Sequence, residues 1–166
     1  MNSIFIRRSI REYIDKPVEK EKIEKILQAA MQAPSARNQQ AWEFIVVTAD
    51  DVKNKVSEIG PSSRLTAKSP VLIVMLGNRD EMLIPDKWAQ DMGACAQNML
   101  LQIVQEGMGG VWLGIYPDKD RVDAIRKIFR LPENIEPFGV ISFGYSERNN
   151  KFTDRYKENK IHWEVY

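Results

Sequence analysis

The chain has 166 residues, a net charge of +1, 43% hydrophobic residues and 28% charged residues. This balance is typical of a globular protein in water. It argues against a basic nucleic-acid binder and against attraction to an anionic membrane surface. The single cysteine, Cys95, excludes an internal disulfide framework and fits a reducing compartment.

The length suits one domain with a substantial core, so we expect a single domain over residues 1–166. Charged residues stand among the first twelve positions, where a secretory signal would need an apolar segment. The apolar runs are also far shorter than a bilayer span. We therefore predict a cytoplasmic protein without a membrane partner.

Hydrophobic spacing predicts alternating helices and strands. In chain order these are a helix over 17–32, a strand over 43–48, a helix capped by Asp50 or Asp51, a strand over 71–76, a helix over 88–106, a strand over 111–116, a helix over 119–130 and a strand over 138–143. The run 71–76 is apolar throughout, which indicates a strand covered on both faces. The helix 88–106 is apolar on most sides, which favours burial in the core or between two subunits. Residues 161–166 alternate as a strand does and could form an arm that reaches a second subunit.

Five residues near the start, Arg7-Arg8-Ser9-Ile10-Arg11, bring three guanidinium groups and one hydroxyl together. In an extended segment Arg7, Ser9 and Arg11 would point to one side, and Arg8 and Ile10 to the other. Guanidinium groups bind oxyanions with two donors at once, so this stretch suits a phosphate. On its own, a stretch of this kind is more often a basic turn on a solvated surface.

Three further motifs follow this basic stretch in a fixed order. They are Ala33-Pro34-Ser35-Ala36-Arg37-Asn38-Gln39-Gln40-Ala41-Trp42, then Gly110-Val111-Trp112-Leu113-Gly114, then Asp154-Arg155-Tyr156. As an ordered set, the four motifs resemble the nitroreductase family of flavin mononucleotide (FMN) oxidoreductases. The resemblance covers nearly the whole chain. It implies an α+β fold with a mixed sheet flanked by helices, in an intertwined homodimer whose C-terminal arm is exchanged between subunits.

The resemblance also implies a set of cofactor-binding residues. Arg7 and Ser9 match positions that hold the phosphate and ribityl end of FMN, Arg155 matches a C-terminal phosphate arginine, and we include Arg8 in this group. Arg11 matches the cation beside the pyrimidine edge, where negative charge develops on reduction, so we expect it to tune reactivity.

Two segments are expected at the flavin ring. Ser35, Ala36, Arg37 and Asn38 match a loop that touches the flavin from the other subunit, and Gln40 could contact it too. Trp112, Leu113 and Gly114 match a strand end whose main chain approaches the ring. Arg64 stands where relatives often have a basic contact. Trp42 is expected to pack in the core.

The implied activity transfers hydride from NADH or NADPH through flavin N5 to a nitroaromatic, quinone or similar acceptor by a ping-pong mechanism. The flavin carries the chemistry, so no side chain is required as an acid or base. Two alternatives stay open. One is a non-enzymatic flavin-binding protein, and the other is a different reaction on this scaffold, such as enone reduction, dehalogenation or flavin fragmentation.

Other chemistries find little support. His162 is the only histidine, and together with Cys95 it cannot supply a zinc site, so we expect no metal. Gly107-Met108-Gly109 begins like a dinucleotide fingerprint, but Trp112 occupies the third glycine position. Cys95 is expected to be a packed thiol and Asp91 a helix-terminus stabiliser. The connector 78–87, with Trp88 beyond it, is the segment we expect to shape access of the acceptor.

Overall fold

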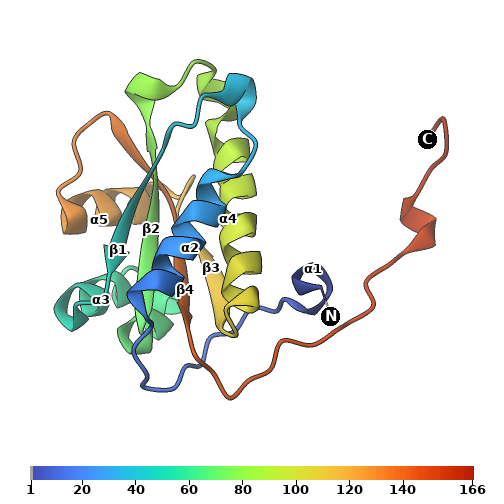
Figure 1. Ribbon diagram of the computed structural model, residues 1–166. Coiled ribbons are helices and arrows are strands. Elements are labelled where there is room, and N and C mark those ends of the chain that lie inside the picture. The colour runs from blue at the N-terminus through green and yellow to red at the C-terminus, as the bar shows by residue number, and fades with distance from the viewer. Residues whose placement is uncertain (1) are drawn as a thin grey trace.

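The computed structural model describes residues 2–166, and its centre is a four-stranded sheet with helices on both faces (Figure 1). The strands are β1 (Trp42–Val47), β2 (Val71–Asn78), β3 (Gly109–Gly114) and β4 (Ile135–Gly144), in the order β1-β2-β4-β3. The α-helices are α1 (Ser3–Ile6), α2 (Lys20–Met31), α3 (Asp50–Ser57), α4 (Trp88–Gln105) and α5 (Lys119–Phe129). Short 3-10 helices are η1 (Ala36–Asn38), η2 (Pro61–Lys68), η3 (Arg79–Glu81), η4 (Pro85–Lys87) and η5 (Glu158–Lys160).

The α+β class is confirmed, but the expectation of a mixed sheet is wrong for this chain. All three strand pairs, β1 with β2, β2 with β4 and β3 with β4, are antiparallel. Strands β2 and β3 run in the same direction, but β4 lies between them and pairs with both. A parallel contact is found at one isolated bridge, between Ser9 and Gly110 on the outer edge of β3.

Two apolar cores lie on opposite faces of the sheet. One is shared with α2 and α4, and the other with α3 and α5 (Figure 1). Strand β2 contributes to both, because Ile73 and Met75 enter the first core while Leu72 and Val74 enter the second. All four side chains are buried. The prediction that this apolar run is covered on both faces is therefore confirmed.

Helix α4 is the longest helix of the described chain. One side, which includes Met92, Met99 and Ile103, is buried against α2 and the sheet. The opposite side carries the half-buried Ala94 and Leu101. Burial on nearly all sides, which the composition predicts, is thus incomplete in the single chain, and the side of α4 with Ala94 and Leu101 stays half-exposed.

Cys95 lies in the buried side of α4 and is fully buried. Burial disfavours the thiolate and raises the pKa of this thiol to about 12. The expectation of a packed, unreactive thiol agrees with this environment.

The start of α3 differs from the expectation. Ala49 occupies the N-cap position, while Asp50 and Asp51 fall in the first helical turn. Carboxylates there still stabilise the positive end of the helix, and Asp50 also pairs with Lys53 Nζ at 2.8 Å.

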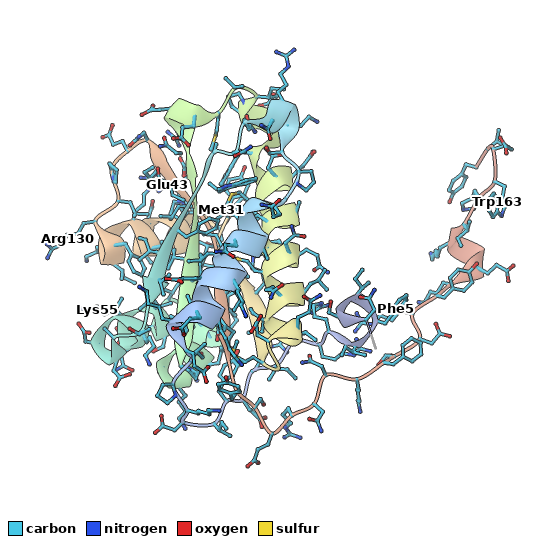
Figure 2. The ribbon with its side chains drawn as sticks, in the orientation of Figure 1. Phe5, Met31, Glu43, Lys55, Arg130 and Trp163 are labelled. Atoms are coloured by element: carbon cyan, nitrogen blue, oxygen red, sulfur yellow. The ribbon has the colours of Figure 1, made fainter. Side chains whose placement is uncertain are left out.

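The C-terminal residues 151–166 extend away from the rest of the molecule (Figure 1). The alternating residues 161–166 form no strand, and none of the strands within residues 2–166 pairs with them. Trp163, far out on this segment in Figure 2, is 83% exposed. Within residues 2–166, no helix is both long and apolar enough to cross a membrane.

Candidate functional site

Residues 7–13, which we call the N-terminal strap, lie along the outer edge of β3. Ser9 forms the parallel bridge with Gly110, and the amide of Ile10 donates to the Gly110 carbonyl at 3.0 Å. The Ile10 side chain is buried directly over Gly109, where a Cβ atom would lie 2.5 Å from Ile10 Cγ1. Gly109 therefore lets the strap approach the sheet closely enough to place Ser9 and Arg11 beside β3.

Tyr13 closes the other end of the strap. Its hydroxyl lies 2.9 Å from both the Ile10 carbonyl and the Ser142 carbonyl, and 3.0 Å from Ser142 Oγ. Ser142 Oγ is in turn 2.6 Å from Ser69 Oγ. Burial raises the pKa of Tyr13 to about 12, against the opposing effects of the Ser142 hydrogen bond and of Arg11. The sequence motifs contain no signal for this network, because its partners are far apart in the chain.

In a Tyr13→Phe variant we expect the free energy of unfolding at pH 8 to fall by about 1–3 kcal/mol, because buried carbonyls lose their donor. The two proteins should converge at alkaline pH. The folded-state pKa of Tyr13 lies above the ordinary value of 10.0, so its contribution is complete below pH 10 and is lost as pH rises toward 12. Urea unfolding of both proteins across this pH range measures the difference, and parallel stability curves would contradict the role of the hydroxyl.

Arginines from both ends of the chain converge at the start of the strap. The pKa of Arg7 is lowered by its burial first, and then by repulsion from Arg155 and Arg8. Arg8 Nη1 donates to the carbonyls of Phe5 and Arg7, whereas the buried Arg8 Nη2 has no hydrogen-bond partner within residues 2–166. Three cations with a buried free donor form an environment that a multivalent anion would stabilise, so these residues fit the phosphate of FMN.

A groove of about 630 Å³ opens at Arg8, and two acidic residues, Glu12 and Glu147, also line it. Arg8, Ser9 and Arg11 line it together with Arg148 and Lys151. Arg8 therefore shares a groove with Ser9 and Arg11, rather than pointing away from them as strict strand alternation predicts. Asn150 lies beside the groove: its Oδ1 accepts from the Arg8 amide and its Nδ2 donates to the Met108 carbonyl, both at 3.0 Å.

Strand β3 leads from this groove along the edge of the sheet. Trp112 is 38% exposed and lies across Gly139, with its ring centroid 5.4 Å from that of Phe138. Leu113 is buried, and a Cβ at Gly114 would meet no atom within 4 Å. The open space at Gly114 is where the backbone can approach a flat ligand.

The loop Ser35–Gln40 has an unusual backbone. Arg37, Asn38 and Gln40 all have positive φ, at 50°, 56° and 48°. Gln40 Nε2 donates to Asn38 Oδ1 at 2.7 Å, and Ser35 Oγ accepts from the Gln40 amide at 3.1 Å. Asn38 and Gln40 are both exposed, so the loop presents their polar groups outward.

This loop and the strap lie at opposite ends of α4 (Figure 1). The Ala36 amide donates to Asp91 in the first turn of α4, while Ser3, just before the strap, lies 3.5 Å from Gln105 in the last turn. About fourteen residues of helix separate these contacts, which is about 20 Å. The two sets of predicted site residues therefore do not meet within one chain.

The other predicted residues are placed as follows. Arg64 lies on η2, whose Ser62 hydroxyl accepts from Arg121 Nη2 at 2.8 Å. Arg121 Nη1 in turn donates to the Gly114 carbonyl at 2.9 Å, so η2 lies near the end of β3.

Trp42 is buried in the core, as expected. Asp91 is in the first turn of α4, and its carboxylate binds Ala36 and Gln39 of the Ser35–Gln40 loop. The sequence motifs do not reveal this contact.

The connector between β2 and α4 borders a second cavity of about 320 Å³. Arg79, Met82, Trp88, Tyr116 and Glu136 are among its lining residues. Trp88 forms edge contacts with both Tyr116 and Phe138, at centroid distances of 5.0 and 5.7 Å. The aromatic groups thus continue from Trp112 through Phe138 to this cavity.

The chain is similar to known oxidoreductases over its whole length. The model of the nitroreductase family matches residues 4–64 and 60–145. A protein of Methanothermobacter thermautotrophicus named as an NADH dehydrogenase/NAD(P)H nitroreductase is 40% identical over 166 residues, which cover 100% of this chain and 87% of the relative. A solved structure described as an NADH oxidase from Clostridium acetobutylicum has a TM-score of 0.97 at 47% identity and covers 99% of this chain and 100% of its own.

A third comparison concerns a solved structure with a ligand. A nitroreductase from Desulfovibrio desulfuricans, in complex with FMN, has a TM-score of 0.85 at 27% identity, covering 99% of this chain and 95% of its own. The fold and these similarities define an oxidoreductase of the nitroreductase type. Within that class, the chain belongs to the nitroreductase family.

Proposed function

We propose that residues 1–166 form a single FMN-binding domain that acts as a homodimeric NAD(P)H oxidoreductase. The flavin would supply the redox chemistry, which is hydride uptake at N5 from NADH or NADPH and electron transfer to a nitroaromatic, quinone or similar acceptor in a ping-pong sequence. The observation that carries the proposal is the group of Arg7, Arg8 and Arg155, with its buried free donor.

The arginine group supplies the phosphate end of the site. Each charge-assisted hydrogen bond is worth about 1.5–3 kcal/mol, so several together can retain a dianion in water. Ser9 adds a hydroxyl for the ribityl chain at the bridge to Gly110. Arg7, Arg8, Ser9 and Arg155 all belong to one chain, so this end of the site needs no other subunit.

The ring would lie along the edge of β3. Arg11, near enough to Tyr13 to oppose the rise of its pKa, supplies a cation beside the strand, and Arg64 on η2 is a second candidate. The backbone of Leu113 and Gly114 would face the ring, with Trp112 beside it. A cation fixed near the ring stabilises the negative charge that reduction creates.

The remaining contacts require a second copy of the chain. Ser35, Ala36, Arg37, Asn38 and Gln40 are about one helix length from the strap in the same chain. A two-fold axis that pairs the half-exposed faces of two antiparallel α4 helices would bring this loop to the strap of the other copy. The exposed C-terminal arm would then lie on the second subunit.

Reducing substrate and acceptor would use the same site in turn, since the sequence has no dinucleotide fingerprint. The cavity at Trp88 and Tyr116 is our candidate for the wall that shapes acceptor access. Its aromatic rings favour planar molecules.

The test is the visible spectrum of the purified protein, with mass spectrometry of the small molecule that heat releases. We expect FMN at about one per chain in a dimer, and oxidation of NADH or NADPH that depends on added nitrofurazone or menadione. A bound flavin without turnover with any acceptor would favour the non-enzymatic alternative. A colourless monomer that ignores added FMN would refute the proposal.

A further inference from the structure

The Ser35–Gln40 loop keeps a backbone that its residues do not favour. Arg37, Asn38 and Gln40 lie in the left-handed region, with φ between 48° and 56°. Residues other than glycine adopt this region at a cost in free energy, so surrounding contacts must determine the shape of the loop. The hydrogen bonds within the loop, from Gln40 to Ser35 and to Asn38, involve exposed groups that water can replace.

The contacts that fix the loop are buried. Asp91 is 9% exposed and Gln39 is 8% exposed. Asp91 Oδ1 accepts from the Ala36 amide at 3.0 Å, and Asp91 Oδ2 accepts from Gln39 Nε2 at 2.5 Å. Gln39 Oε1 accepts from the Ile84 amide at 2.9 Å. One continuous chain of hydrogen bonds therefore joins the loop, the start of α4 and the connector before α4.

We propose that Asp91 and Gln39 are positioning residues for the flavin site of the partner subunit. They hold the loop in the one conformation that presents Ser35, Arg37 and Asn38 to the flavin of a second copy. Through the Ile84 amide, Gln39 also fixes the position of the connector relative to that loop. The connector borders the Trp88 cavity. The inference rests on the proposed function, because it assumes that the loop serves a flavin.

In this series of hydrogen bonds, the donor and the acceptor of each bond are determined by its partners. The amide oxygen of Gln39 must face the Ile84 N–H, so its NH₂ group must face Asp91. In Asp91→Asn, the amide oxygen at position 91 can still accept from the Ala36 N–H. The NH₂ group at position 91 then faces the NH₂ group of Gln39. In Gln39→Glu, two carboxylates face each other. Both single changes therefore place like groups in a buried contact.

The double variant Asp91→Asn/Gln39→Glu restores the match. The carboxylate introduced at position 39 can accept from the Ile84 amide and from the NH₂ group introduced at position 91, while the amide oxygen at position 91 accepts from Ala36. The short contacts are again paired and contain one carboxylate as in the natural chain, and only the 3.5 Å contact of Gln39 Nε2 with the Ile84 carbonyl is lost. A rescue of this kind follows from the hydrogen-bond geometry and not from side-chain size.

The experiment compares the wild-type full chain, the two single variants, the double variant and Asp120→Asn. Asp120→Asn is the matched control, because Asp120 is exposed on α5. Each apoprotein is titrated with FMN by flavin fluorescence, and hydrogen exchange is followed at residues 35–40. We expect each single variant to bind FMN about 10- to 100-fold more weakly, with faster exchange in the loop. The double variant should recover to within a few-fold of wild type, and the control should not change.

The outcomes separate two questions. If wild type binds FMN and the single variants lower only the melting temperature, with unchanged affinity and loop exchange, the positioning role is wrong while the proposed function stands. A double variant that binds FMN no more tightly than the single variants would also overturn the positioning role. If Asp91→Asn does not fold, Gln39→Met removes the contacts of Gln39 with Asp91 and with the Ile84 amide and should also lower the affinity for FMN. Failure of wild type to bind FMN would overturn the proposed function and this inference together.

Discussion

Arg7→Ala is expected to lose its flavin during purification, with an FMN dissociation constant about 10- to 100-fold higher than wild type at low salt. The guanidinium of Arg7 has a lowered pKa because it is partly buried and lies near Arg155 and Arg8. A phosphate dianion at this place would offset the repulsion among the three cations. Removing one of them takes away a charge-assisted contact that no neighbour can fully replace.

The loss should depend on salt, which distinguishes an electrostatic contact from a folding defect. Screening weakens the interaction in wild type more than in the variant, so the two affinities should approach each other as ionic strength rises. Lys55→Ala is a suitable control, because Lys55 is exposed on α3, far from the strap (Figure 2). Unchanged FMN retention in Arg7→Ala, or a loss that is equal at all salt concentrations, would count against the phosphate role.

Removal of residues 151–166 is expected to give a folded protein that is monomeric and binds no flavin. Within the described chain, these residues make no hydrogen bond to residues 2–150. They nevertheless carry large apolar side chains that are mostly exposed, such as Trp163 at 83% and Val165 at 79%. Apolar side chains displayed in this way are typical of a segment that packs on a partner. Truncation should therefore lower the stability of the single chain little, but it should strongly weaken the contact between two chains.

The truncation should end after Asn150, because Asn150 donates to the Met108 carbonyl and accepts from the Arg8 amide. Circular dichroism and thermal melting check the fold, light scattering after gel filtration gives the oligomeric state, and absorbance reports flavin. The triple variant Ile161→Ser/Trp163→Ser/Val165→Ser is the matched control, since it keeps Arg155 but removes the apolar contacts. A truncated protein that stays dimeric and yellow would contradict the role of the arm.

Local elements could be predicted well where hydrophobic spacing alone decides them. The run 71–76 became the buried β2, and the periodic helices 88–106 and 119–130 became α4 and α5 within one or two residues. The first helix begins at Lys20 and not near Pro17, while α1 and η2 were missed. These are short elements without apolar periodicity, and tertiary contacts decide their conformation.

The candidate site was predictable only in its residue types. The motifs indicate the basic strap, the loop Ser35–Gln40 and the strand at Trp112, because charge, proline and glycine leave marks in sequence. They do not reveal Tyr13, Gln39 or Asp91. These act through buried or part-buried hydrogen bonds to groups as far as 52 and 129 positions away, and such distant pairings have no local pattern.

By itself, the sequence determined the α+β class, the double-sided burial of β2 and the family, since periodicity and ordered motifs are local properties. Tertiary structure alone decided that β4 enters between β2 and β3, which makes the sheet antiparallel. It also decided that the strap and the Ser35–Gln40 loop stand at opposite ends of α4. Both outcomes depend on which distant surfaces pack together, and the free energy of that packing is shared among segments that no single stretch of sequence contains.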